Sequence, residues 1–329
     1  MSSRVRVGIA GTGSYLPERV VSNDDIARIV DTSDEWIRQR TGIGERRHVE
    51  PGQNTSDLSF EAAKRALEQA GMSAAELDMI IVGTVTPDCP MPTVSCRIQE
   101  MLGAKSAASM DVNAACTGFL TALHTAEAFV ASGRCKNVLA IGAESLSRFV
   151  DFTDRGSCIL FGDGAGAAIV SPFEDCQQGE ILEAHLGSDG SGYDFIQMPM
   201  GGAEFPPHSP DYRIEDHFIK LKGRDVYRFA VTKMAEMIET VTEGIDRDEV
   251  ALVVPHQVNQ RIIDAALERM GWEAERCFVN IEKYGNTSAA SVPIALDEAH
   301  REGRFVKGKY IVLVAFGAGL TWGATLLRW

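Results

Sequence analysis

The chain has 329 residues, of which 45% are hydrophobic, and 32 Lys and Arg stand against 46 Asp and Glu, which gives a net charge of −14. This length allows two domains or one large α/β unit with an ample core. An acidic chain argues against general binding to nucleic acids or anionic membranes. No apolar run approaches the roughly 18 residues that span a bilayer. The segment Met1–Val7 lacks the apolar stretch of a secretory signal, so we expect a cytoplasmic protein.

The predicted elements alternate between strands and helices along the whole chain. Helical spacing of apolar residues marks 59–70 and 119–130 as amphipathic helices. Runs rich in β-formers predict strands at 5–10, 79–83, 138–141, 165–170, 251–254, 277–281 and 310–315. This alternation is typical of parallel sheets covered by helices.

The second part of the sequence repeats the first. Residues 78–142 match residues 250–315 in their order of strands, polar turns and helices, at an offset near 173 residues. We therefore predict two similar halves, 1–175 and 176–329, joined through the segment 172–179. The stretch 188–217 is rich in Gly, Pro and His and has no periodicity, which is typical of a long functional loop.

The seven cysteines do not suggest a disulfide framework or a metal site. Their number is odd, none forms a C-x-x-C pair, and no two histidines have a zinc-site spacing. Two glycine-rich segments, 11–16 and 162–166, invite a nucleotide interpretation. The first has Leu16 in place of the third glycine, and the second leads into a strand rather than a helix, so tight turns fit both better.

Three residues able to do chemistry follow predicted strands. Cys116 lies where a strand meets a helix, a place where free N–H groups stabilise a thiolate, although a small buried cysteine is an equal alternative. His256 and Asn286 follow strands of the second half, where each alone is more often a structural residue or a cap. Ligands of such sheets gather at strand ends, and Cys with His and Asn suits acyl transfer through a thioester. A papain-like protease shares this order, but the sequence around Cys116 does not match one.

Several segments together resemble β-ketoacyl-acyl-carrier-protein synthase III, the condensing enzyme that starts type II fatty acid synthesis. They are 31–37, 40–43, 113–119, 154–156, 254–259, 284–291 and 316–323, and the likeness spans nearly the whole chain. The resemblance implies an α/β thiolase-like fold of two pseudo-symmetric halves, with stacked sheets in a layered αβαβα arrangement. One departure is Ala318, which stands between Gly317 and Gly319 where the family commonly has a third glycine.

The resemblance also implies the catalytic roles. Cys116 would take an acyl primer, acetyl above all, from coenzyme A. His256 and Asn286 would hydrogen-bond the thioester carbonyl of malonyl-acyl-carrier-protein during decarboxylation, and the N–H groups of Cys116 and Ala318 would hold the second oxyanion. The acyl-CoA is a substrate, and no cofactor or metal is expected.

The resemblance assigns binding roles as well. Coenzyme A would lie near Trp36, Arg40, Arg155 and Asn259, residues suited to adenine, phosphate and pantetheine. An acidic carrier protein would dock on the basic segment 218–233, whose local charge is +4. The docking residues would be Arg224, Arg228, Gln257 and Arg261. A solvated helix face remains an open alternative for these arginines, as does an ordinary aromatic role for Trp36.

The acyl pocket would contain Phe161 and also Met91, which would cross a homodimer interface into the partner. Acetyl, branched and medium-length primers all stay open, because Met is adaptable. A degradative thiolase needs a second catalytic Cys in 316–323, which contains none. A non-catalytic binding protein would be expected to lose one of Cys116, His256 and Asn286. A polyketide or other secondary-metabolite ketosynthase keeps all three and remains an alternative.

Overall fold

The first sheet lies in the N-terminal half of the computed structural model, which describes residues 5–329. Residues 1–4, part of the segment read for a signal, lie outside the described residues. The sheet has the order β1-β7-β6-β4-β5. Strand β4 runs parallel to both neighbours, whereas β7 runs antiparallel to β6 and β1. The strands are β1 (Val7–Tyr15), β4 (Met79–Gly83), β5 (Ala108–Val112), β6 (Val138–Glu144) and β7 (Gly164–Pro172).

The second sheet repeats this order with one strand fewer. Its order is β11-β12-β13-β8, with β11 and β12 parallel and the other pairs antiparallel. The strand predicted at 277–281 is wrong, because only Cys277 pairs with Val253 before the chain turns into a short helix. The strands are β8 (Glu180–Ser188), β11 (Val250–Pro255), β12 (Tyr310–Gly317) and β13 (Thr321–Arg328).

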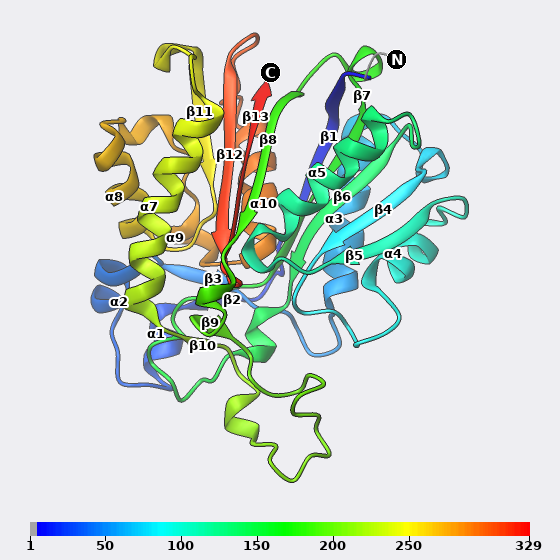
Figure 1. Ribbon diagram of the computed structural model, residues 1–329. Helices are drawn as coiled ribbons and strands as arrows, with labels where there is room; N and C mark the ends of the chain where they lie inside the picture. Colours follow the sequence, from blue (N-terminus) through cyan, green and yellow to red (C-terminus); the bar gives the residue numbers. More distant parts are fainter. Residues whose placement is uncertain (1–4) are drawn as a thin grey trace.

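Helices form three layers around the two sheets (Figure 1). Helices α5 (Gly118–Ala131) and α10 (Ser291–Arg301) lie between the sheets and share one core with both. The outer layers are α3 (Thr55–Ala70) and α4 (Val94–Leu102) on the first sheet, and α7 (Gly223–Val241) and α8 (Gln260–Met270) on the second. The predicted αβαβα arrangement is confirmed, and the uniform expectation of parallel sheets is corrected to mixed ones.

The position of each helix follows from its apolar pattern. Helix α3 buries Leu58, Ala62 and Ala66 on one face, and it begins at a capping box formed by Asn54 and Asp57. Helix α5 is apolar nearly all round, as a helix covered on two sides must be. Within the described residues, no helix combines the length and apolarity that a membrane crossing requires.

Two excursions lie beyond the strand ends. The first, between β1 and α3, contains β2 (Val20–Ser22), α1 (Asn23–Ala27), α2 (Asp34–Thr41) and β3 (Glu45–Arg47). The second contains the predicted loop 188–217 with β9 (Ile196–Gln197), followed by β10 (Lys220–Leu221), and it hangs below the sheets in Figure 1. The remaining short elements are α6 (Phe173–Cys176) in the predicted joining segment, α9 (Ile281–Tyr284), and the 3₁₀ turns η1 (Ala74–Glu76), η2 (Ala115–Thr117), η3 (Leu146–Phe149), η4 (Gly190–Gly192), η5 (Ile214–Asp216), η6 (Arg247–Glu249), η7 (Ala274–Arg276) and η8 (Ser288–Ala290).

Candidate active site

Cys116 lies in the turn η2, between the end of β5 and the start of α5. The preceding residue, Ala115, has a φ of +47°, a strained value for a residue other than glycine. Cys116 lines two neighbouring cavities, one of about 660 Å³ and one of about 150 Å³. A thiol placed between two cavities can meet a ligand that enters through one and occupies the other.

The electrostatic surroundings of Cys116 differ from the prediction. Burial raises the pKa of the Cys116 thiol to about 11, and the nearby carboxyl of Glu144 adds to the rise. The Ser288 hydroxyl and the backbone N–H of Ala318 pull the pKa down without cancelling that rise. Burial therefore opposes the thiolate that the strand–helix junction is expected to stabilise.

The loop 317–319 is pressed against Cys116. A Cβ atom on Gly317 would lie 2.8 Å from the Cys116 Cβ and 2.9 Å from its backbone nitrogen, so only glycine fits there. The Thr321 hydroxyl lies 3.2 Å from the Ala114 carbonyl oxygen and 3.0 Å from that of Ala318, which ties the two loops together. Ala318 has no positive φ, so its side chain causes no backbone strain in this loop.

His256 follows β11 and is buried, with only 1% of its surface exposed. Its Nδ1 lies 2.6 Å from the Ser291 hydroxyl, and this hydroxyl accepts a hydrogen bond from the Gln257 N–H. In the tautomer in which Ser291 donates its proton to Nδ1, the ring proton lies on Nε2, where it can serve a ligand. Burial lowers the pKa of His256 to about 3, so the ring is neutral. Nε2 is buried without any hydrogen-bond partner among residues 5–329.

Asn286 lies two residues beyond the end of α9. Its Oδ1 accepts a hydrogen bond of 2.9 Å from the Ser288 N–H, and its backbone N–H donates to the Leu160 carbonyl. With Oδ1 occupied, the Nδ2 protons remain available to a ligand. Asn286, His256 and Cys116 all line the smaller cavity, so the structure brings the three predicted residues together.

The four predicted coenzyme A residues also gather in one place. The guanidinium carbons of Arg40 and Arg155 lie 5.5 and 5.0 Å from the centre of the Trp36 ring. The Asn259 side chain donates to the Arg40 carbonyl oxygen at 3.1 Å and accepts from the first turn of α8. Asn259 lines the smaller cavity, so this cluster lies close to the same cavity as Cys116.

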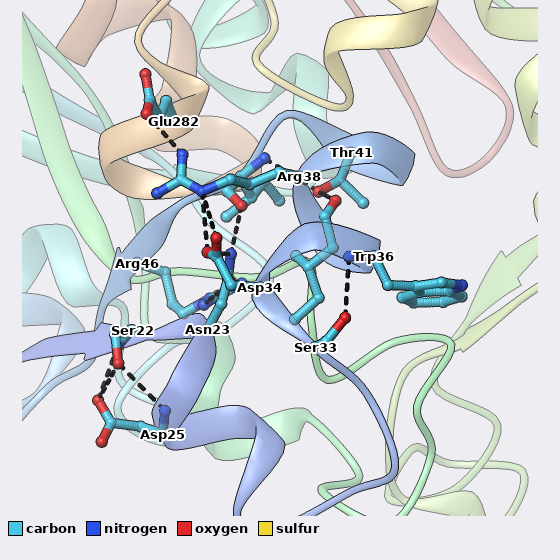
Figure 2. Close-up of polar contacts among 12 residues, drawn as sticks. Ser22, Asn23, Asp25, Ser33, Asp34, Trp36, Arg38, Thr41, Arg46 and Glu282 are labelled. Carbon is cyan, nitrogen blue, oxygen red and sulfur yellow. Dashed lines mark hydrogen bonds and ion pairs between the residues drawn. The ribbon is translucent and has the colours of Figure 1, made fainter.

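A polar network that the sequence analysis missed fixes α2, the helix of Trp36 (Figure 2). Arg38 donates to Asp34 at 2.9 Å and to Glu282 of α9 at 2.7 Å. Asn23 donates to Asp34 and accepts from the fully buried Arg46, each at 2.8 Å. Burial lowers the pKa of Arg46 to about 10. The network joins the Trp36 helix to the helix that precedes Asn286.

The predicted docking residues divide into two groups. Arg224 and Arg228 are exposed on α7, Arg261 is exposed on α8, and Tyr227 of α7 donates to the Arg261 carbonyl. The prediction for Gln257 is corrected, because its side chain is 1% exposed. It donates to the carbonyls of Pro255 and Phe278 and accepts from the Asn280 N–H, which uses its polar atoms inside the protein.

The larger cavity contains the predicted Phe161 and draws one wall from the loop predicted at 188–217. Its apolar lining includes Val85, Leu146, Phe161, Ile196, Met198, Phe205 and Ile219. Met91 is 83% exposed and does not line this cavity within its own chain, so its predicted role across a dimer stays a prediction. Within residues 5–329, no group of His, Cys, Asp and Glu is arranged to hold a metal ion.

Comparisons with known proteins agree with these observations. Family models described as 3-oxoacyl-[acyl-carrier-protein] synthase III match residues 110–190, and those of its C-terminal part match 241–329. A β-ketoacyl-[acyl-carrier-protein] synthase III of Caldanaerobacter subterraneus subsp. tengcongensis is 48% identical over 100% of this chain and 99% of its own. The crystal structure of the 3-oxoacyl-[acyl-carrier-protein] synthase III from Aquifex aeolicus superimposes with a TM-score of 0.90 and 46% identity, over 98% of this chain and 100% of that one. The priming β-ketosynthase of the R1128 polyketide pathway is 35% identical with a TM-score of 0.91, over 100% of this chain and 98% of its own.

Proposed function

The chain belongs to the 3-oxoacyl-[acyl-carrier-protein] synthase III family of condensing acyltransferases, and we propose that it joins an acetyl primer to malonyl-acyl-carrier-protein through Cys116. One observation carries the residue roles: Nε2 of the neutral His256 ring is buried without a hydrogen-bond partner, and His256 and Asn286 line the same cavity as the Cys116 thiol. This arrangement suits a reaction in which negative charge appears on a thioester oxygen.

In the first half-reaction the Cys116 sulfur attacks the acetyl carbonyl of acetyl-CoA. The carbon–sulfur bond to the enzyme forms, the bond to coenzyme A breaks, and the coenzyme leaves as its thiolate. The backbone N–H groups of Cys116 and Ala318 are placed to stabilise the tetrahedral oxyanion, because the loop 317–319 is pressed against the nucleophile.

In the second half-reaction the malonyl thioester enters the emptied site. His256 and Asn286 donate to its carbonyl oxygen while the carbon–carbon bond to the carboxylate breaks and carbon dioxide leaves. Neutral donors suit this step because they stabilise the enolate without protonating it. The enolate carbon then attacks the acetyl thioester, the carbon–sulfur bond to Cys116 breaks, and a 3-oxoacyl carrier protein is released.

Two clusters provide binding for the partners of these steps. Trp36, flanked by Arg40 and Arg155, presents an aromatic face and positive charge for the nucleotide end of coenzyme A. The exposed arginines 224, 228 and 261 present positive charge on α7 and α8, which an acidic carrier protein would complement.

The primer is expected to occupy the larger cavity beside Phe161. A volume of about 660 Å³ exceeds what acetyl needs, so a second wall is required for selectivity. We propose that the enzyme works as a cytoplasmic homodimer in which the exposed Met91 closes the partner's cavity. The open cavity and the likeness to a polyketide priming ketosynthase favour one alternative, a secondary-metabolite ketosynthase with a larger primer.

A survey of primers tests the proposal. The protein, malonyl-acyl-carrier-protein and one acyl-CoA at a time are mixed, and the condensation products are identified by mass. Acetoacetyl carrier protein as the main product supports the proposed function, whereas condensation only with long or branched primers favours the alternative. Absence of any acyl group on Cys116 would overturn both.

A further inference from the structure

Glu144, the last residue of β6, is a fully buried carboxyl without a charged partner. Its Oε2 accepts hydrogen bonds from Thr86 Oγ1 at 2.6 Å, from Thr84 Oγ1 at 3.3 Å and from the Val85 N–H at 3.2 Å. Its Oε1 accepts from the Ser288 hydroxyl at 3.2 Å. No Lys, Arg or His within residues 5–329 forms an ion pair with it. A buried and uncompensated carboxyl is costly to keep, which calls for a role.

Ser288 connects this carboxyl to the nucleophile. Its hydroxyl donates to Glu144, and its turn η8 packs against η2, the turn that carries the Cys116 thiol, whose pKa Ser288 lowers. Ser288 lines the larger cavity beside Cys116 and has a φ of +47°. Ala115, which stands 173 residues earlier and just before Cys116, has the same φ, so this turn accepts a residue without a hydroxyl.

Acylation requires a group that takes the thiol proton. Burial lowers the pKa of the His256 ring to about 3, so it is a poor base. Glu144 is the better acceptor, because burial raises its pKa to about 7. The elements around this carboxyl, namely the residues after β4 and the turns η2 and η8, present hydroxyls, backbone groups and one titratable side chain, Cys116.

We propose that Glu144 and Ser288 form a proton relay that deprotonates Cys116 during acylation. The thiol proton passes to Ser288 Oγ, the Ser288 hydroxyl proton passes to Glu144 Oε1, and the sulfur electron pair forms the bond to the acyl carbonyl carbon. When condensation releases the Cys116 thiolate, the same protons return and restore the carboxylate. The proposal rests on the proposed function, in which Cys116 is the acylated residue.

The balance of buried charge supports this relay. The ionised carboxyl opposes a second negative charge on the thiol, which is one reason why the pKa of Cys116 is raised. Moving the proton from sulfur to Glu144 moves the single negative charge without adding another. A base outside this pocket would leave two buried negative charges in contact through one hydroxyl, which is less favourable.

The test is the pH dependence of a single acylation turnover, measured as the acetyl mass added to Cys116 between about pH 5.5 and 9. In the unmodified protein the rate should rise with pH and level off, with an inflection close to the Glu144 pKa of about 7. In S288A and E144Q the rate should fall at least about tenfold and the inflection should disappear. T84V is the matched control: it removes one hydrogen bond to the carboxyl but not the relay, so the inflection should move upward and the plateau should remain.

The outcomes separate the relay from the proposed function. An S288A protein with the rate and pH profile of the unmodified protein overturns the relay, and so does an S288A protein that is slow but keeps the inflection. If E144Q does not fold, as thermal unfolding would show, S288A still tests the relay. Alanine is tolerated in this backbone conformation, because Ala115 has the same φ of +47° as Ser288. Failure of the unmodified protein to acquire acetyl on Cys116 would overturn the proposed function instead.

Discussion

Replacing His256 with Ala should slow decarboxylation and spare acylation. In the free protein Nε2 is buried and unpaired, so its donor capacity is fully available to the thioester oxygen. One such donor contributes about 10²–10³ in rate, equivalent to about 3–4 kcal/mol of transition-state stabilisation. We expect decarboxylation of malonyl-acyl-carrier-protein to fall by this factor in H256A and N286A, and by less than the product in the double variant, because both donors serve one oxygen.

The variant C116A should show the reverse pattern. Without the thiol, no acetyl group can be transferred from acetyl-CoA to the protein, while both donors remain in place for decarboxylation. Burial lowers the pKa of His256 to about 3, below its ordinary value, so the ring stays neutral at higher pH. Decarboxylation by C116A should therefore be nearly constant between about pH 5 and 8. A rate that falls as the pH rises through this range would require a protonated His256 with a raised pKa, and would contradict the neutral ring.

A paired assay distinguishes the roles of the three residues. Acyl-enzyme formation is measured by mass, and carbon dioxide release from malonyl-acyl-carrier-protein is measured on the same preparations. Condensation should fail in all three variants because it needs both half-reactions. If H256A lost acylation yet released carbon dioxide at the normal rate, His256 would be the base for Cys116, and both the donor assignment and the relay through Glu144 would be refuted.

Three further predictions concern the walls and rim of the site. Gly317→Ala places a Cβ 2.8 Å from the Cys116 Cβ, so acylation should fall by about 100-fold in the mass assay. Gly190→Ala is the control and should keep its rate, because a Cβ there meets no atom within 4 Å. Exchange of Arg224, Arg228 and Arg261 for Glu should raise KM for malonyl-acyl-carrier-protein and leave acetyl transfer from acetyl-CoA unchanged. Exchange of the exposed Arg134 for Glu, on another part of the surface, is the control and should alter neither. Equal losses in both half-reactions would contradict the docking face. Met91→Ala should widen the range of primers condensed, as measured with a series of acyl-CoA substrates, and an unchanged chain-length profile would exclude Met91 from the acyl cavity.

The sequence predicts the layers of the fold well but the direction of some strands poorly. The internal repeat and the alternation of strands and helices are enough to predict two packed α/β halves. The closing strands β7 and β13 run antiparallel to β6 and β12 because the connections before them contain no crossover helix. The short link 318–320 could have indicated this for β13, since a parallel pair needs a longer connection.

The candidate site shows the same division between local and distant information. Cys116 and His256 are found because each follows a strand within a recognisable motif. Asn286 is found from its motif although the strand predicted before it is wrong and helix α9 precedes it instead. Ser291 and Ser288 are missed as functional residues, since their partners lie 35 and 144 residues away in the sequence. The error for Gln257 has the same origin: a polar residue after a strand can face solvent or the interior, and only the position of Asn280 and its neighbours decides which.

The internal repeat explains how one site acquires two kinds of chemistry. The turns η2 and η8 occupy equivalent positions at the starts of the two central helices, and they meet so closely that a Cβ on Gly118 would lie 3.1 Å from the Ala289 side chain. The first turn carries the nucleophile at position 116, and the second carries Ala289 at the equivalent position. The second half instead places Ser291, the counterpart of Gly118, against the His256 ring. The two halves thus contribute different groups to one site, a nucleophile from the first half and, in the proposed function, the donors His256 and Asn286 from the second.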